Sequence, residues 1–237
     1  MIKTERQMKI MEILRERKFC TVNELAKMLF VSQVTVRRDL NLLESASLAK
    51  RCHGGVTLFE QFNHEVPVEV RKNSNSSVKA QLAKQAIRHL NSGDTVFIDA
   101  SSTVLHLCEL ITKDMNLTVI TNSITVLERL REKRVKCYCT GGMLLENSNA
   151  LAGSIAENCI RSMYADVLFF STQGISENGE ITDYSEEETR LRSLMIEHAK
   201  KSVYIFDSSK FGKRYLFKQC DAHDIDYIIS DCETFFN

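Results

Sequence analysis

Residues 22–44, VNELAKMLFVSQVTVRRDLNLLE, contain two helical patterns of apolar residues separated by a short break. Thr21 and Glu24 have the spacing of a capping box, so one helix is expected to begin at Thr21. Ser32 is a suitable N-cap for the second helix, which follows the break. A further amphipathic helix is expected from about residue 4 to residue 17. Three short helices with a tight turn between the last two predict a helix-turn-helix.

The second helix of this stretch is the predicted recognition helix. Val36 and Leu40 lie on its buried face, and polar residues crowd its first two turns, where such a helix meets base edges and phosphates in the major groove. The following stretch, AKRCHGGVTLF at 49–59, places two glycines between a basic and an alternating apolar part, which predicts a β-hairpin wing. The predicted contacts to double-stranded DNA are Ser32, Gln33, Val34, Thr35, Arg37 and Arg38 of the helix and Lys50, Arg51 and His53 of the wing.

Residues 22–44 and the run KRCHGG at 50–55 resemble the DNA-binding domain of the DeoR family of bacterial regulators, and the similarity extends through most of the chain. Ser47 stands at a position that the family often gives to glycine. The resemblance implies a second domain with the fold of ribose-5-phosphate isomerase. It also implies that this domain binds a phosphorylated sugar or a related metabolite.

Composition agrees with a DNA-binding protein that works in the cytoplasm. The net charge of the 237 residues is zero, but residues 1–60 hold 11 Lys/Arg against 7 Asp/Glu, a balance of +4, and residues 61–237 hold 20 against 24, a balance of −4. No apolar stretch approaches the ~20 residues needed to cross a bilayer. The start, MIKTERQMKIMEIL, does not have the pattern of a signal peptide. The eight cysteines include no CxxC pair, so reduced thiols are expected, with no metal and no cofactor.

The chain is expected to have two domains. A winged helix-turn-helix domain occupies residues 1–58, a linker with the only proline occupies 59–77, and an effector-sensing domain occupies 78–237. Ser76 or Ser77 is expected to cap the first helix of the sensing domain. Strands then alternate with helices, which predicts a mostly parallel sheet with helices on both faces. The expected strands are residues 95–99, 117–121, 135–140, 165–171, 202–207 and 225–230.

Polar loops follow four of these strands, and in a parallel sheet they lie along the carboxyl edge, where ligands of α/β sheets bind. Backbone N–H groups that open two helices would point at a bound anion, glycines would allow close approach, and a lysine would supply a cation. Each motif also has a purely structural interpretation, as an N-cap, a turn or a solvated side chain. The loop residues expected to bind the effector are Asp99, Ser101, Ser102, Thr103, Thr121, Asn122, Ser123, Gly141, Gly142 and Lys210.

The DeoR resemblance supports the same edge. The family's pattern of D-x-G-[ST]-T, T-N-S, G-G and S-K-F matches residues 99–103, 121–123, 141–142 and 209–211. Glu188 matches an acidic position that the family has on the helix before the last ligand loop. Ser101 departs from the pattern, because the family usually has glycine there, and a serine would be strained if the backbone needed a positive φ.

Three classes of function are compatible with these residues. The favoured one is a repressor of a sugar-utilisation operon, at least dimeric, whose ligand weakens operator binding. The second is a sugar-phosphate isomerase or deaminase with a DNA-binding appendage, for which Asp99, Glu188 and Lys210 are the groups capable of acid/base chemistry. The third is a cysteine-based metal or redox sensor.

Overall fold

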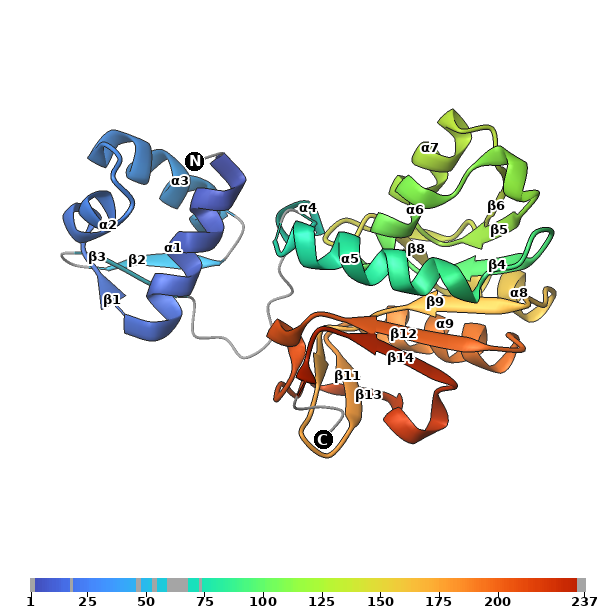
Figure 1. The fold of residues 1–237 in the computed structure, drawn as a ribbon. Coiled ribbons are helices and arrows are strands. Elements are labelled where there is room, and N and C mark those ends of the chain that lie inside the picture. The colour runs from blue at the N-terminus through green and yellow to red at the C-terminus, as the bar shows by residue number, and fades with distance from the viewer. Residues whose placement is uncertain are drawn as a thin grey trace. The chain divides into compact units, whose positions relative to one another are not determined.

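A computed structural model describes residues 3–17, 19–45, 48–52, 55–58, 68–72 and 74–233 (Figure 1). The chain divides into two compact units, residues 1–74 and residues 75–237. Of the predicted linker, residues 59–67 and 73 lie outside the described residues, and α4 (Val68–Arg71) is a short helix within it.

In the first unit, the described residues up to Leu58 form a three-helix cluster with a small antiparallel sheet, as the winged helix-turn-helix prediction requires. The capping box is confirmed, because the Thr21 N–H donates to Glu24 Oε2 at 2.7 Å and the Glu24 N–H donates to Thr21 Oγ1 at 3.1 Å. Ser32 Oγ accepts from the Thr35 N–H at 3.2 Å, so its role as N-cap is also confirmed. The elements are α1 (Lys3–Arg17), β1 (Phe19–Cys20), α2 (Val22–Met28), α3 (Gln33–Ser45), β2 (Ala49–Cys52) and β3 (Gly55–Leu58), with strand order β1-β3-β2.

The second unit is built on a six-stranded sheet in which every pair of neighbouring strands is parallel. All six predicted strands are present, in the order β14-β12-β9-β4-β5-β6. Side chains that alternate along β4 divide the interior into two apolar cores, since Val96 and Ile98 face one and Phe97 faces the other. The strands are β4 (Thr95–Ile98), β5 (Thr118–Thr121), β6 (Lys136–Cys139), β9 (Val167–Phe170), β12 (Ser202–Phe206) and β14 (Tyr227–Ser230).

Helices cover both faces of this sheet (Figure 1), as the alternating pattern predicts. One core includes residues of α5 (Ser76–Ala86), α6 (Leu107–Leu110) and α7 (Ile124–Glu132), and the other includes residues of α8 (Ser154–Arg161) and α9 (Glu186–Glu197). Within the described part of the chain, no helix is both long and apolar enough to span a membrane.

The structure corrects several local predictions. The N-cap of α5 is Asn75, in the left-handed region at φ 52°, rather than Ser76 or Ser77. The helical segment expected between the first two predicted strands is, over residues 104–110, a 3-10 turn, Val104–His106, followed by the single turn of α6. Short strands went unpredicted: β7 (Met143–Leu145), β8 (Ala150–Ala152), β10 (Gly174–Ile175), β11 (Glu180–Asp183) and β13 (Phe217–Asp221). Further 3-10 turns are Ile87–His89, Lys113–Met115, Ser208–Lys210 and Ala222–Asp224.

Candidate DNA-binding and effector sites

The predicted recognition helix α3 presents its polar residues to solvent. On this helix, Val36 and Leu40 are buried, whereas Gln33, Arg37 and Arg38 are exposed. A buried ion pair ties the helix to α1, because Asp39, which is fully buried, accepts from the Arg6 guanidinium. Removing one partner of such a pair would leave the other charge uncompensated, so the pair fixes how α3 is presented.

The wing strand β2 is joined to α3 by Arg51. Its guanidinium donates to the Arg37 carbonyl oxygen at 3.2 Å and lies 3.5 Å from the Glu44 carboxylate. Arg51 therefore positions the wing, in addition to its predicted phosphate contact. Lys50 is exposed, and His53 lies outside the described residues. A hollow of about 390 Å³ adjoins this face, lined by Thr21, Val22, Asn23, Gln33, Arg37, Leu40, Arg51 and Gly55.

In the second unit, Asp99 follows β4 and its carboxylate is engaged within the protein. Oδ1 accepts from the Ser101 N–H at 3.1 Å and from Ser101 Oγ at 2.6 Å. Oδ2 accepts from the Ser171 N–H at 3.2 Å and from Arg192 Nε at 3.1 Å. Ser101 has no positive φ, so the loop does not need glycine there, and its hydroxyl adds a contact that glycine would lack. Asp99 thus holds the shape of the loop, and its contact with the effector stays a prediction.

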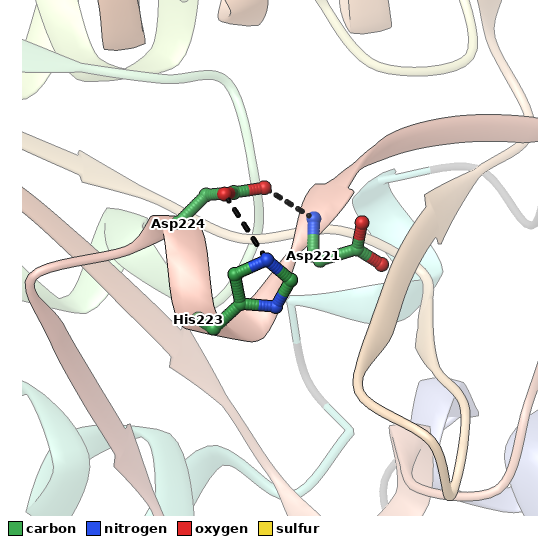
Figure 2. A group of neighbouring side chains, drawn as sticks. All are labelled: Asp221, His223 and Asp224. Carbon is green, nitrogen blue, oxygen red and sulfur yellow. Dashed lines mark hydrogen bonds and ion pairs between the residues drawn. The ribbon is translucent and has the colours of Figure 1, made fainter.

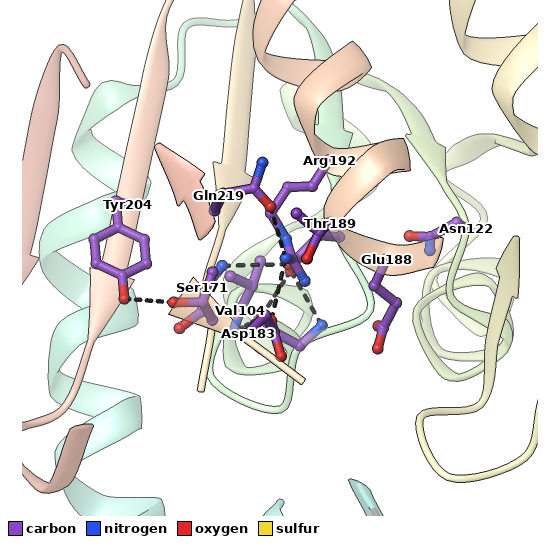
Figure 3. A network of polar contacts seen from close by, with 12 residues as sticks. Val104, Asn122, Ser171, Asp183, Glu188, Thr189, Arg192, Tyr204 and Gln219 are labelled. Atoms are coloured by element: carbon purple, nitrogen blue, oxygen red, sulfur yellow. Dashed lines mark hydrogen bonds and ion pairs between the residues drawn. The ribbon is translucent and has the colours of Figure 1, made fainter. Parts of the chain in front are cut away.

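Arg192, on α9, joins this loop to the small antiparallel sheet (Figure 3). Its Nη1 donates to Asp183 of β11 at 3.1 Å and to Gln219 of β13 at 3.0 Å. Burial alone would lower the pKa of Arg192, but Asp183 and Asp99 outweigh it and hold the pKa above its ordinary value. Asp183 and Gln219 were missed by the sequence reasoning, because the strands that carry them were not predicted.

Two lysines that are far apart in the sequence, Lys79 and Lys210, contact the loop that contains Ser102 and Thr103. Lys79 of α5 is 3% exposed, and its Nζ lies 3.2 Å from Ser102 Oγ. Lys210 Nζ donates to Thr103 Oγ1 at 3.0 Å and to Ser171 Oγ at 2.7 Å. Among the hydrogen bonds of the described residues, none uses the amide N–H of Ser102 or Thr103. The loop therefore has two backbone N–H groups that these hydrogen bonds leave unused, in residues whose side chains two cations contact.

Lys79 was not predicted, although the sequence contained a signal for it. It lies three and four residues before Leu82 and Ala83, so it falls on the buried face of α5. A charge on a buried face requires a partner or a ligand. Asp207 is close enough to Lys79 to be this partner. Burial would raise the pKa of the Asp207 carboxyl, but Lys210, Ser209 and Lys79 hold that pKa below its ordinary value.

Asn122 and Glu188 lie beside this network (Figure 3) and line a narrow crevice that has no room for a water molecule. Asn122 is 3% exposed, and its Nδ2 donates to the Leu151 carbonyl oxygen at 3.2 Å. Its Oδ1 is buried without a hydrogen-bond partner, which is unusual in a folded protein. The lining residues are Asp99, Ala100, Asn122, Glu188, Leu191, Arg192 and Met195.

The remaining predicted residues have structural roles on the same edge. Thr121 Oγ1 donates to the Ile98 carbonyl oxygen at 2.7 Å, and Ser123 caps α7 by accepting from the Val126 N–H at 3.3 Å. Gly141 and Gly142 both have positive φ, and a Cβ on Gly142 would lie 2.4 Å from the Ala152 carbonyl oxygen. The close approach at Gly142 is therefore to another strand of the protein.

One group of side chains in the described part of the chain has metal-ligand chemistry: Asp221, His223 and Asp224 (Figure 2). Asp221 already pairs with Lys218 Nζ at 2.7 Å, and Asp221 and Asp224 cap a 3-10 turn, so the carboxylates have structural partners. Seven cysteines whose side chains are described are free thiols: Cys20, Cys108, Cys137, Cys139, Cys159, Cys220 and Cys232. Burial raises the pKa of Cys108 to about 12.

Comparison with known proteins adds the family. A model of the DeoR C-terminal sensor domain matches residues 74–232, and a model of the DeoR-like helix-turn-helix domain matches residues 6–62. The transcriptional repressor AccR of Agrobacterium fabrum is 32% identical, over 97% of this chain and 90% of that protein. The L-fucose operon activator of Haemophilus influenzae is 32% identical, over 89% of this chain and 85% of that protein. Ribose 5-phosphate isomerase A of Methanocaldococcus jannaschii is 13% identical with a TM-score of 0.45, over 58% of this chain and 55% of that chain.

Proposed function

Because the chain belongs to the DeoR family of DNA-binding transcriptional regulators, we propose that it represses a sugar-utilisation operon and that a phosphorylated sugar releases it from operator DNA. The relative named for the L-fucose operon supports a sugar as the class of effector. A regulator of this kind acts in the cytoplasm, on DNA.

The observation that carries the proposal is the convergence of Lys79 and Lys210 on two unpaired amides. The Nζ atoms lie 3.2 Å from Ser102 Oγ and 3.0 Å from Thr103 Oγ1. Phosphate is a dianion near neutral pH with oxygens that only accept, so two ammonium groups and two N–H donors match it in charge and in hydrogen-bonding sense. The helix dipole contributes little, since only one 3-10 turn and the single turn of α6 follow the loop.

We propose that the other end of the effector meets Asn122 and Glu188, whose crevice has no room for a water molecule as it stands and must open to admit a ligand. The unpaired Oδ1 of Asn122 and the carboxyl group of Glu188 both offer acceptor oxygens, so they select a group that donates, such as a sugar hydroxyl. A buried acceptor left unpaired discriminates strongly against an analogue that lacks the hydroxyl. The proposed effector is thus anionic at one end and rich in hydroxyl groups at the other.

Release from DNA requires that the effector bind one conformation of the protein better than the other. We place the helix-turn-helix units in a homodimer or a larger homo-oligomer, because paired recognition helices match operator half-sites one helical repeat apart. Sedimentation of the free and DNA-bound protein tests this assembly, and a 27.1 kDa monomer in both states would contradict it.

The experiment is a thermal-shift screen against phosphorylated sugars, followed by operator release measured by fluorescence anisotropy. An effector at 100 times its dissociation constant stabilises by about 2.7 kcal/mol. Lys79→Ala and Lys210→Ala should each bind DNA normally but need about 10- to 100-fold more effector for release, because a charge-assisted contact is worth about 1.5–3 kcal/mol. The exposed Lys113→Ala is the matched control. Wild-type release concentrations in both variants would refute the phosphate site.

We also propose that the sensor unit binds its ligand without converting it. A fold shared with an isomerase does not establish isomerase chemistry. Asp99, one of the three groups such an enzyme would use, is engaged by Ser101, Ser171 and Arg192. Aldose–ketose conversion by the purified protein would contradict this proposal.

A further inference from the structure

Helix α2 ends in a Schellman motif that has phenylalanine at the position glycine usually occupies. The Val31 N–H donates to the Ala26 carbonyl oxygen at 3.1 Å, and the Phe30 N–H donates to the Lys27 carbonyl oxygen at 3.3 Å. Phe30 is the residue after the C-cap Leu29, with φ 55°. An L-residue with a Cβ is disfavoured in this left-handed region, which is why glycine predominates there.

The side chain of Phe30 receives no compensation from the fold. It is 94% exposed, so its ring buries almost no surface in the protein. A residue that is strained in its backbone and exposes its apolar ring lowers the stability of the unit. A contact that offsets this cost would have to be made with another molecule.

The position of Phe30 indicates which molecule. Phe30 lies two residues before Ser32, the N-cap of the recognition helix, and Val34 on that helix is 73% exposed. These are the two most exposed large apolar side chains among the described residues of the first unit. They flank the end of α3 that enters the major groove in a helix-turn-helix.

We propose that Phe30 packs against the apolar parts of DNA, the deoxyribose rings and thymine methyl groups at the edge of the groove that α3 enters. The proposal rests on DNA binding by α3. A protein partner fits less well, because a stable protein interface needs about 800 Å² on each side. Beyond Phe30 and Val34, the large exposed apolar residues described in this unit are Phe19 and Leu42, at 44% and 41%.

The test compares Phe30→Gly and Phe30→Asn with the wild-type full-length chain. Glycine and asparagine both accept a positive φ, and asparagine does so without the flexibility of glycine. Both variants should raise the thermal midpoint by about 4 °C. Both should weaken binding about five-fold to a duplex that the wild-type protein selects from random sequence. The slope of log K against log salt should stay unchanged, because no phosphate contact is lost.

Tyr164→Ala removes an aromatic side chain that is 76% exposed in the second unit, and it should leave DNA affinity unchanged. Uracil in place of thymine in the selected duplex distinguishes contact with a methyl group from contact with deoxyribose. The proposal is overturned if the Phe30 variants bind within two-fold of the wild type, if only the glycine variant loses affinity, or if neither variant is more stable. A wild-type chain that selects no duplex would instead refute DNA binding by α3.

Discussion

Asp99→Asn tests whether the contacts of Arg192 hold the second unit together. The asparagine side chain keeps one acceptor oxygen and gains an NH₂ group, which would face the N–H donors of Ser101, Ser171 or Arg192. Breaking a buried ion pair costs about 3–5 kcal/mol. Arg192 keeps Asp183 as a partner, so the lower figure, about 3 kcal/mol, is expected.

For a unit of this size, each kcal/mol shifts the thermal midpoint by about 2–4 °C, so Asp99→Asn should melt about 6–12 °C lower. Differential scanning calorimetry measures the shift, and Asp114→Asn, at an exposed aspartate, is the matched control. DNA binding at low temperature should be retained, because the recognition helix belongs to the other unit. A midpoint within about 2 °C of the wild type would refute the structural role assigned to Asp99.

Three further predictions concern separate parts of the chain. Gly142→Ala should destabilise the protein by about 3 kcal/mol or more, because the new Cβ would lie 2.4 Å from a carbonyl oxygen. Gly141→Ala, whose new Cβ has its nearest atom at 3.7 Å, should cost only about 1–2 kcal/mol, and denaturant titration compares the two variants. Burial lowers the pKa of His89, so the wild type should lose stability as pH falls below 6.5, and His89→Phe should lose less between pH 7.5 and 5.5 in thermal melts. Arg37→Ala and Arg38→Ala should differ in their effects on DNA binding. Loss of a base contact removes about 1–3 kcal/mol of binding free energy and relaxes the base preference at one position of the operator, while loss of a phosphate contact lowers the slope of log K against log salt by about one. Full operator affinity in the double alanine variant would refute the assignment of the recognition helix.

The parallel sheet could be predicted because its strands are short apolar runs bounded by turn residues. Residues 95–98, TVFI, are an example: three of the four are buried, and no helical spacing competes. The strand of residues 180–183, EITD, is too short and polar to stand out as an apolar run, and it lies between its neighbour β10 and β13, a strand about 40 residues later in the chain. Local pattern therefore located the main sheet and missed the small one.

The candidate site divides in the same way. Residues 101–103 and 121–123 could be proposed as effector contacts because they lie at or just after the ends of predicted strands, and these contacts stay predictions. The contact between Asp99 and Arg192 joins residues 93 positions apart, and no local pattern reports such a pair. Ser123 illustrates a further limit, since an N-cap and a ligand contact require the same side chain at the same place.

The place of Lys79 in the chain bears on how a ligand could act at a distance. Lys79 lies on the first turn of α5, and the first unit ends at residue 74, five residues earlier (79 − 74). Asn75, at the entry to α5, donates to Asp207 at 2.9 Å, and Asp207 also lies near Lys79. A phosphate bound by Lys79 would add negative charge beside this carboxylate, at the point where the polypeptide enters the second unit. The proposed phosphate site therefore lies only a few residues along the backbone from the end of the first unit, in the segment that leads back to the DNA-binding elements.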